Sequence, residues 1–551
     1  MNTFCVRIVR ATVLLICLLG SANLHSATPP PNILMFIIDD LAPIGTTFGG
    51  PVELPSIQSI AERGVSFTNN YANIPVCGAS RASMMSGLAP TSTRFLTFDS
   101  RLDEDAPEAL SIPGFFRANG WHTAANGKIF DVIADSENSW SEPVWSPESQ
   151  WHGKTPDHRG EHLQAAYIEP VSTSRFPYSE RLPANDDDYP DGQVASKSIA
   201  DLARLAQMEN PFFLAVGFRK PHLPFNAPEH YWSDEESVNL PATWSQPGTD
   251  IPLDFAGHLS PELRRQYDAL PFFGEPDTAQ AKEIVAAYHA AARYADAQVG
   301  RVLDALEKSG QANNTIVILM GDHGFLLGQH KLWTKHSLFD SALRTPLIIK
   351  DPRLAQTATV TAVTDLLDVY PTLVDLAGLQ TSRSPNGIAL DGAVLDGAAL
   401  DGQSLRALLE APDDTITGHK KASIARWLNG ESIRVNQYRY TRWFDKNNET
   451  LAEMLYDLTE DPDESRNLVS ETSSFAQIEQ LRQLLEQDRQ GAVWSEPLDA
   501  GVAQWNLLAS PVGRLLILSI VHPVATKVVA GSLLLMIVLL IWARLRSRRQ
   551  R

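Results

Sequence analysis

Four short apolar runs mark the first 350 residues of the chain, at positions 32–38, 212–217, 315–320 and 347–349. A short run without polar alternation is typical of a strand that is covered on both faces, as in a parallel sheet. Helical patterns lie between these runs, and in residues 281–306 apolar positions recur at spacings of three and four. Strands that alternate with helices predict an α/β fold.

Charged side chains follow two of these predicted strands directly. Asp39 and Asp40 end the first run, and Asp322 and His323 follow the third. Ligands in such sheets bind beyond the carboxyl ends of the strands, so we expect these four side chains to meet there. An acidic pair at a strand end is also often a helix cap or a solvated loop. Together with a residue at position 77, however, the set could surround one hard divalent cation.

The remaining patterns predict an insertion and a second, smaller domain. Residues 135–200 are rich in Trp, Ser, Pro, Asp and Glu and show little periodicity, which predicts a long insertion over the site, a candidate lid. Residues 382–405 contain Leu-Asp-Gly three times and are interpreted as a surface loop. Strand-like segments such as 432–444 then follow. We therefore predict a catalytic domain over 28–415 and a C-terminal α+β subdomain over 416–495.

Both ends of the chain resemble membrane signals. Residues 1–27 combine two arginines, an apolar run and small residues, which is the layout of a secretory signal peptide. Residues 524–543 are mostly apolar, carry no charge except that of Lys527, and are long enough to cross a bilayer. The arginine-rich residues 544–551 then predict a cytoplasmic tail, after a juxtamembrane connector at 496–523. These signals predict an exported, membrane-anchored protein whose catalytic domain is periplasmic or extracellular.

Composition excludes several classes of protein. With 44% hydrophobic and 20% charged residues, the 551-residue chain is ordinary for a globular protein and not for a disordered or fibrous one. Its 65 acidic and 46 basic residues give a net charge of −19. Nucleic acid is therefore not an expected partner, because phosphate contacts need a basic surface.

Cysteine usage draws attention to position 77. Cys5 and Cys17 lie in the predicted signal peptide, so the exported chain keeps only Cys77, which can form no internal disulfide. A lone thiol in an oxidising compartment is prone to unwanted oxidation. Cys77 is therefore either a small buried side chain of the apolar core or a residue with a role in the chemistry of the protein. If Cys77 begins a helix, Arg81 lies one turn later on the same face, beside a helix end that favours anions.

The segment from Cys77 to Arg81, Cys-Gly-Ala-Ser-Arg, resembles the Cys-x-Pro/Ala-x-Arg signature of the sulfatase family within the alkaline-phosphatase superfamily. Further segments match this family in order, and most closely its iduronate-2-sulfatase type, at residues 32–40, 127–128, 211–217, 220–225, 322–335, 455–458 and 461–468. The resemblance covers residues 31–470. It implies an alkaline-phosphatase-like fold, in which helices sandwich a large mixed, mostly parallel sheet.

The resemblance also implies roles for single residues. Cys77 would be oxidised to formylglycine by a maturation enzyme, and the hydrated aldehyde, a gem-diol, would attack sulfur. Five residues would bind a divalent cation, for which we expect Ca²⁺ and keep Mg²⁺ as the alternative: Asp39, Asp40, the modified residue 77, Asp322 and His323. Four would line the sulfate pocket: Arg81, Lys128, His222 and Lys335. Either His222 or Lys335 would give a proton to the leaving alcohol.

Two positions depart from the family pattern. Ala79 stands where many members have Pro, which leaves open which maturation system acts on the chain. Asp131 stands where related enzymes usually have His, the expected base for the collapse of the sulfated intermediate. Asp131 therefore either accepts that proton itself or points away from the pocket while another group replaces it.

The resemblance and the predicted membrane signals together imply a membrane-tethered sulfuric ester hydrolase that acts on sulfated carbohydrate. Its acidic body would repel a polysulfated chain at long range, which favours small or end-trimmed oligosaccharides. One alternative is a phosphodiesterase or phosphonate monoester hydrolase of the same superfamily. A second, motivated by Asp131, is a non-catalytic protein that binds sulfated glycans.

Overall fold

The structure is a computed structural model, and it describes residues 29–148, 176–379, 394–412 and 422–491, except for positions 234–236, 247, 259, 261, 272–273, 355–356, 396–397 and 446. The predicted signal peptide, connector, membrane span and basic tail all lie outside the described residues. No helix in the described ranges combines the length and the apolarity that crossing a bilayer requires.

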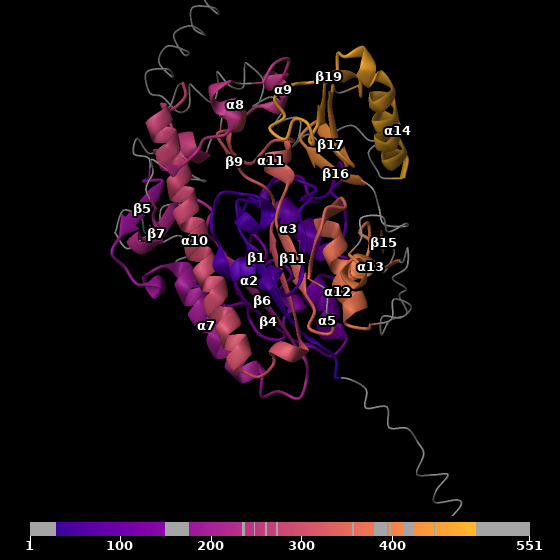
Figure 1. Ribbon diagram of the computed structural model, residues 1–551. Coiled ribbons are helices and arrows are strands. Elements are labelled where there is room, and N and C mark those ends of the chain that lie inside the picture. The colour runs from indigo at the N-terminus through magenta and orange to yellow at the C-terminus, as the bar shows by residue number, and fades with distance from the viewer. Residues whose placement is uncertain are drawn as a thin grey trace, which may run out of the picture.

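A seven-stranded mixed sheet forms the centre of the larger domain (Figure 1). In spatial order its strands are β12 (Ala358–Val360), β2 (Val65–Phe67), β11 (Leu347–Lys350), β8 (Thr315–Gly321), β1 (Asn32–Ile38), β6 (Phe212–Phe218) and β4 (His122–Gly127). The four strands from β8 to β4 run parallel, whereas β11 is antiparallel to both of its neighbours. The predicted mixed, mostly parallel sheet is thus confirmed.

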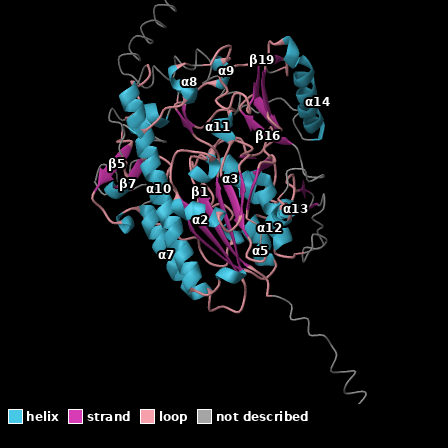
Figure 2. Ribbon diagram, viewed as in Figure 1, coloured by secondary structure: helices cyan, strands magenta, loops and turns pink. Residues whose placement is uncertain are grey.

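Helices cover both faces of this sheet (Figure 2). Alternate residues of β1 divide between two apolar cores, Leu34 and Phe36 on one side and Ile33 and Met35 on the other. The first core includes α2 (Pro55–Ala61), α7 (Pro190–Leu205) and α10 (Thr278–Lys308). The second includes α3 (Cys77–Ser86), α5 (Ile112–Ala118), α12 (Val369–Leu376) and α13 (Arg406–Glu410). Because both faces are covered, the unbroken apolar runs in the sequence are explained.

The prediction for residues 135–200 is wrong in part. Residues 149–175 lie outside the described residues, but the end of the segment forms helix α7, which packs on β6 and against α10. Its buried apolar residues, Val194, Leu202 and Leu205, follow helical spacing, but several buried polar and small residues interrupt the pattern. The helix therefore belongs to the domain core and not to a lid.

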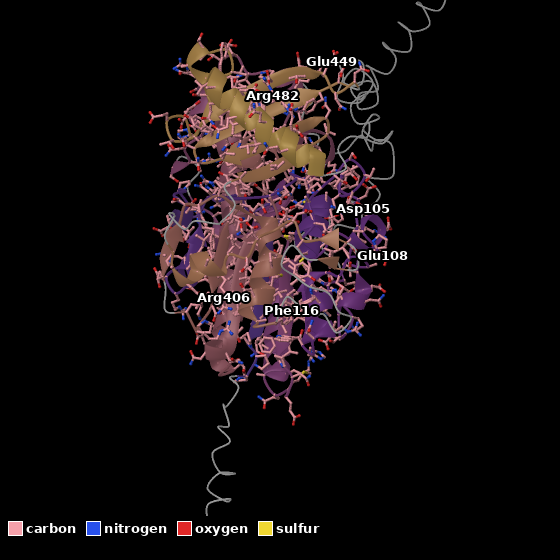
Figure 3. All side chains as sticks on the ribbon, turned by 90° about the vertical axis from the view of Figure 1, so that its right-hand side faces the viewer. Asp105, Glu108, Phe116, Arg406, Glu449 and Arg482 are labelled. Carbon is pink, nitrogen blue, oxygen red and sulfur yellow. The ribbon has the colours of Figure 1, made fainter. Side chains whose placement is uncertain are left out.

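The C-terminal α+β subdomain is confirmed as an antiparallel sheet with one helix. Its strands are β16 (Ala422–Trp427), β17 (Gly430–Val435), β18 (Tyr438–Phe444) and β19 (Thr450–Asp457), and α14 (Phe475–Gly491) packs on them. Arg482 of α14, labelled in Figure 3, forms an ion pair with Glu453 of β19. The boundaries of both domains stay predictions.

A buried polar contact joins the subdomain to the larger domain. The guanidinium of Arg439 on β18 donates to Asp340 over 2.8 Å and lies over the ring of Tyr71 at 4.8 Å. Arg434 donates to the Tyr71 hydroxyl. The subdomain therefore packs against the segments that surround the end of the sheet.

Short strands and short α-helices connect these larger elements. They are β3 (Asn70–Tyr71), β5 (Ser179–Leu182), β7 (Phe225–Pro228), β9 (Leu326–Leu327), β10 (Trp333–Thr334), β13 (Thr364–Asp365), α4 (Leu102–Asp105), α8 (Ala242–Ser245), α9 (Leu253–Ala256) and α11 (Asp340–Leu343). The hairpin of β14 (Val394–Leu395) and β15 (Ala398–Ala399) lies in the segment predicted as a surface loop.

Candidate active site

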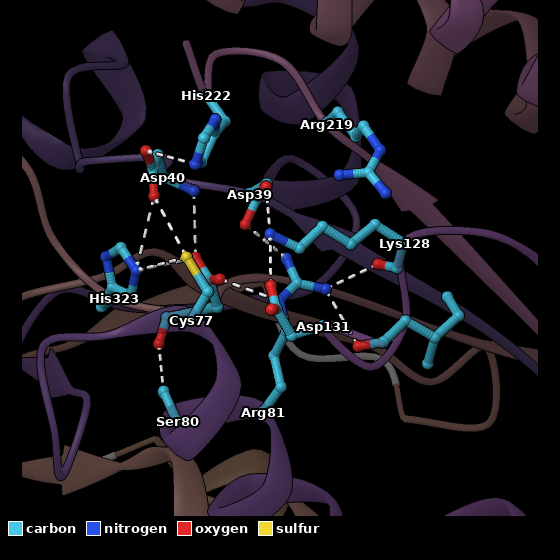
Figure 4. Close-up of polar contacts among 12 residues, drawn as sticks. Asp39, Asp40, Cys77, Ser80, Arg81, Lys128, Asp131, Arg219, His222 and His323 are labelled. Atoms are coloured by element: carbon cyan, nitrogen blue, oxygen red, sulfur yellow. Dashed lines mark hydrogen bonds and ion pairs between the residues drawn. The ribbon is translucent and has the colours of Figure 1, made fainter. Parts of the chain in front are cut away.

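Four neighbouring parallel strands deliver side chains to one place beyond their carboxyl ends. The residues are Asp39 and Asp40 after β1, Asp322 and His323 after β8, Lys128 after β4, and Arg219 and His222 after β6. Helix α3 adds Cys77 and Arg81, and Lys335 follows β10. The structure thus brings together every residue that the sequence proposed for the site, and Figure 4 shows most of them.

Cys77 lies at the centre of this group. It is the first residue of α3, as predicted, and its side chain is buried. The Sγ atom lies 3.6 Å from Asp40 Oδ1 and 3.3 Å from His323 Nε2, and it accepts a hydrogen bond of 3.4 Å from Lys335 Nζ. Burial raises the pKa of the thiol well above its ordinary value. An unmodified Cys77 is therefore a poor nucleophile, because the thiolate is the reactive form.

Residues around Cys77 fit a divalent cation. Two sets of side chains place their potential ligand atoms within 4.8 Å of one another, Asp40, Cys77 and His323, and Asp39, Cys77 and Asp322. Three of these side chains are carboxylates, whose oxygens are preferred by hard cations such as Ca²⁺ and Mg²⁺. The chemistry of the set therefore agrees with the predicted metal site.

Arg81 binds two of the three carboxylates. It donates from Nε to Asp322 and from a terminal nitrogen to Asp39, each over 2.9 Å, and it is fully buried. The other terminal nitrogen donates to the backbone oxygens of Lys128 and Ile129. The guanidinium thereby fixes the ends of β1, β8 and β4 relative to one another, which a lysine could not do.

Lys128 bridges two carboxylates of different kinds. Its Nζ lies 2.7 Å from Asp39, which is fully buried, and 2.8 Å from Asp131, whose side chain is 26% exposed. Burial favours a lowered pKa for Lys128, but Asp131 and Asp39 raise it above its ordinary value. Of the two interpretations of Asp131, the structure contradicts the one in which it points away, because its carboxylate faces the lysine of the pocket.

Lys335 and His222 both face Asp40. Lys335 Nζ donates to both oxygens of Asp40, over 2.8 and 3.1 Å, and lies 3.7 Å from Glu262. His222 Nε2 lies 3.8 Å from Asp40, while Nδ1 donates to the carbonyl oxygen of Leu223 over 2.7 Å. This contact orients the imidazole with Nε2 towards the site.

The two adjacent aspartates carry their charges differently. Burial alone would raise the pKa of Asp39, but Lys128 and Arg81 lower it well below its ordinary value. Burial raises the pKa of Asp40 to about 6 against the opposing effect of Lys335. Asp39 therefore acts as a permanent anion that orders two cationic side chains, Lys128 and Arg81. Asp40 instead shares the ammonium of Lys335 with Glu262.

A strained turn places Asp40. Its φ of 59° is rare for a residue other than glycine, and such strain gathers at functional sites. The Tyr288 hydroxyl on α10 donates to the Asp40 carbonyl oxygen over 2.6 Å and accepts from the Ala42 N–H over 2.9 Å. One hydroxyl thus bridges both sides of the turn.

We expect Tyr288→Phe to lower the free energy of unfolding by about 1–3 kcal/mol, because two buried backbone groups lose their partner. The ring keeps its stacking on Phe325, so packing alone should change little. Urea denaturation measures the loss. Phe325→Leu is the matched control, since it alters the same stack without touching the hydrogen bonds. A Tyr288→Phe variant as stable as the wild type would contradict this role.

Three residues near the site escaped the sequence analysis. Arg219 precedes the 220–225 segment that the analysis did single out, and its buried position beside Asp39 was not signalled. Glu262 lies in a π-helical turn, and Tyr288 in the middle of α10. Neither has a sequence signal, because their contacts join segments more than 70 and more than 240 residues apart.

Comparison with known proteins agrees with this geometry. The model of the family described as Sulfatase matches residues 31–379, and a model of the C-terminal region of N-sulphoglucosamine sulphohydrolase matches residues 328–491. Iduronate 2-sulfatase of Mus musculus is 30% identical over 542 residues, covering 85% of this chain and 96% of the relative.

Solved structures share the fold. A protein determined in complex with its substrate D-glucosamine-2-N,6-O-disulfate superposes with a TM-score of 0.64 at 20% identity, over 86% of this chain and all of that one. A phosphonate monoester hydrolase from Silicibacter pomeroyi reaches 0.63 at 21% identity, over 84% and 96% of the two chains. These likenesses cover most of each chain and show the shared fold.

Proposed function

The chain belongs to the sulfatase family and is a sulfuric ester hydrolase, and from that premise we propose that it removes sulfate from sulfated carbohydrate. The nucleophile is formylglycine made from Cys77, and a divalent cation, Ca²⁺, is bound by Asp39, Asp40, Asp322 and His323. The observation that carries this proposal is the position of the buried Cys77 Sγ. It belongs to both sets of candidate metal ligands and lies 3.4 Å from the Lys335 ammonium.

Modification of Cys77 solves a chemical problem of this site. A buried thiol with a raised pKa is unreactive, whereas a hydrated aldehyde offers one hydroxyl to attack sulfur and a second to release the sulfate. The bound cation would supply Lewis-acid activation of that hydroxyl. Because the chain must be oxidised at Cys77, a formylglycine-generating enzyme is an expected partner.

The cationic side chains have separable roles. Lys128, whose ammonium lies between the buried Asp39 and the partly exposed Asp131, is the proposed ligand of the sulfate oxygens. Arg81 is saturated by carboxylates and backbone oxygens, so it orders the pocket and adds positive potential where charge develops. Lys335 and His222, which both face Asp40, are the two groups that the geometry offers for protonation of the leaving alcohol.

Two observations support a carbohydrate substrate. The mouse relative that aligns over most of both chains is an iduronate 2-sulfatase, and one structural neighbour was solved with a sulfated glucosamine. The net charge of −19 adds long-range repulsion of polysulfated chains, which favours small or end-trimmed oligosaccharides. Export and attachment to a membrane by residues 524–543 remain part of the proposal.

Mass spectrometry of the Cys77 peptide, from protein made in its native host, tests the nucleophile. We expect the lighter aldehyde in place of the thiol. The same preparation should turn over an aryl sulfate faster than an aryl phosphonate ester. An intact thiol together with undiminished sulfate release would overturn the mechanism, and preferred turnover of the phosphonate would overturn the substrate class.

Removal of divalent cations tests the metal site. We expect chelation to abolish sulfate release, because the proposed mechanism relies on the cation for Lewis-acid activation of the nucleophile. Return of Ca²⁺ should restore activity and raise the melting temperature by mass action. If Mg²⁺ restores both better than Ca²⁺, the assignment of the ion is wrong. Full activity in the chelated protein would exclude a metal mechanism.

A further inference from the structure

Asp131 places its carboxylate against Lys128, the proposed ligand of the sulfate group. Its Oδ1 lies 2.8 Å from Lys128 Nζ, and this lysine already has a buried partner in Asp39 at 2.7 Å. The two partners differ in exposure, since Asp39 is fully buried and Asp131 is 26% exposed. Asp131 is therefore the more exposed of the two carboxylates that hold the buried ammonium of Lys128.

We propose that Asp131 sets the charge selectivity of the pocket, favouring monoanionic sulfate esters over dianions. This inference rests on the proposed function, in which Lys128 binds the sulfate group. It assigns Asp131 a role in specificity, in place of the role as a base that the sequence left open.

The argument depends on how electrostatic repulsion scales with the charge of the ligand. An anion held by Lys128 shares the ammonium with Asp131, and its repulsion by that carboxylate is proportional to its own charge. The repulsion energy is therefore twice as large for a dianion as for a monoanionic ester. Charges about 6 Å apart at an effective dielectric constant of about 40 give roughly a tenfold change in affinity per unit of ligand charge.

The reaction itself creates this difference in charge. The substrate, a sulfate ester, carries one negative charge on its sulfate group, whereas the released inorganic sulfate carries two. Asp131 therefore weakens the binding of product more than the binding of substrate. The same effect disfavours phosphate monoesters, which are mostly dianionic at neutral pH, and so separates two ester classes of similar shape.

A pair of matched probes tests the inference. Inorganic sulfate is a dianion and methanesulfonate a monoanion, and neither has an ester bond to cleave. Isothermal titration of both into the cation-loaded full chain measures their dissociation constants. For Asp131→Asn we expect sulfate to bind about 100-fold more tightly and methanesulfonate about tenfold, so that their ratio shifts about tenfold. The variant should fold, because Asp131 is partly exposed and Lys128 keeps Asp39.

Two control variants isolate the charge at this position. Asp131→Glu keeps the charge and should retain the ratio of the wild type. Glu137→Gln removes one negative charge from an exposed position six residues further along the chain and should also leave the ratio unchanged. A shift with Glu137→Gln as large as that with Asp131→Asn would contradict a local effect.

The outcomes distinguish this inference from the proposed function. One outcome is that sulfate binds to the wild type while Asp131→Asn lowers the dissociation constants of both probes by the same factor, or lowers neither. In that case the proposed charge selectivity of Asp131 is wrong, and the assignment of the sulfate pocket stands. If neither probe binds to the wild type or to the variant, the assignment of Lys128 to the sulfate group fails, and the selectivity fails with it.

Discussion

Replacement of Cys77 by alanine is expected to lower the turnover of sulfate esters by about five orders of magnitude or more, because it removes the only proposed nucleophile. The fold should survive, since alanine fits the buried first position of α3 and Cys77 forms no disulfide. Sulfate release from an aryl sulfate measures the loss, and circular dichroism verifies the fold. Residual activity within tenfold of the wild type would contradict covalent catalysis at this position.

Serine at the same position separates attack from release. Its hydroxyl can attack sulfur as the hydrated aldehyde does, but it has no second hydroxyl whose loss of a proton expels sulfate. We therefore expect Cys77→Ser to release at most one equivalent of alcohol and to retain a sulfated serine, visible by mass spectrometry of the intact protein. Continuous turnover by Cys77→Ser would show that the aldehyde is not required.

Local sequence was sufficient for the parts of the site that lie next to strands. Asp39 and Asp40 follow an apolar run, as do Asp322 and His323, and β1 and β8 are neighbours in the sheet. The carboxyl ends of adjacent parallel strands must meet, so the juxtaposition follows from the strands alone. Cys77 and Arg81 were likewise predictable, because helical spacing places them one turn apart on α3.

Contacts between distant segments could not be predicted in the same way. The approach of Glu262 to Lys335 and the bridge from Tyr288 to the Asp40 turn depend on how loops and α10 pack on the sheet. The orientation of Asp131 depends on the competition between solvent and Lys128, which a sequence pattern does not encode. Helix α7 was missed because buried polar residues, including Asp191 and Ser198, weaken its apolar periodicity.

The burial of Arg81 leads to the largest expected effect on stability. Arg81→Gln should lower the free energy of unfolding by about 3–5 kcal/mol, because Asp322 and Asp39 then lose a cationic partner without access to water. The effect should be largest in chelated protein, where no metal ion can neutralise the same carboxylates. Urea denaturation with and without Ca²⁺ measures both quantities.

Arg482 provides the matched control, since it is an arginine that also pairs with a carboxylate, Glu453 at 2.7 Å, but with a side chain that is 35% exposed. Arg482→Gln should cost no more than about 1 kcal/mol, because water replaces the lost contact. Equal losses in the two variants would mean that burial does not amplify the Arg81 contacts. A loss below about 1 kcal/mol in chelated Arg81→Gln would mean that Asp39 and Asp322 are not both ionised there, and the electrostatic basis of the proposed metal site would then fail with it.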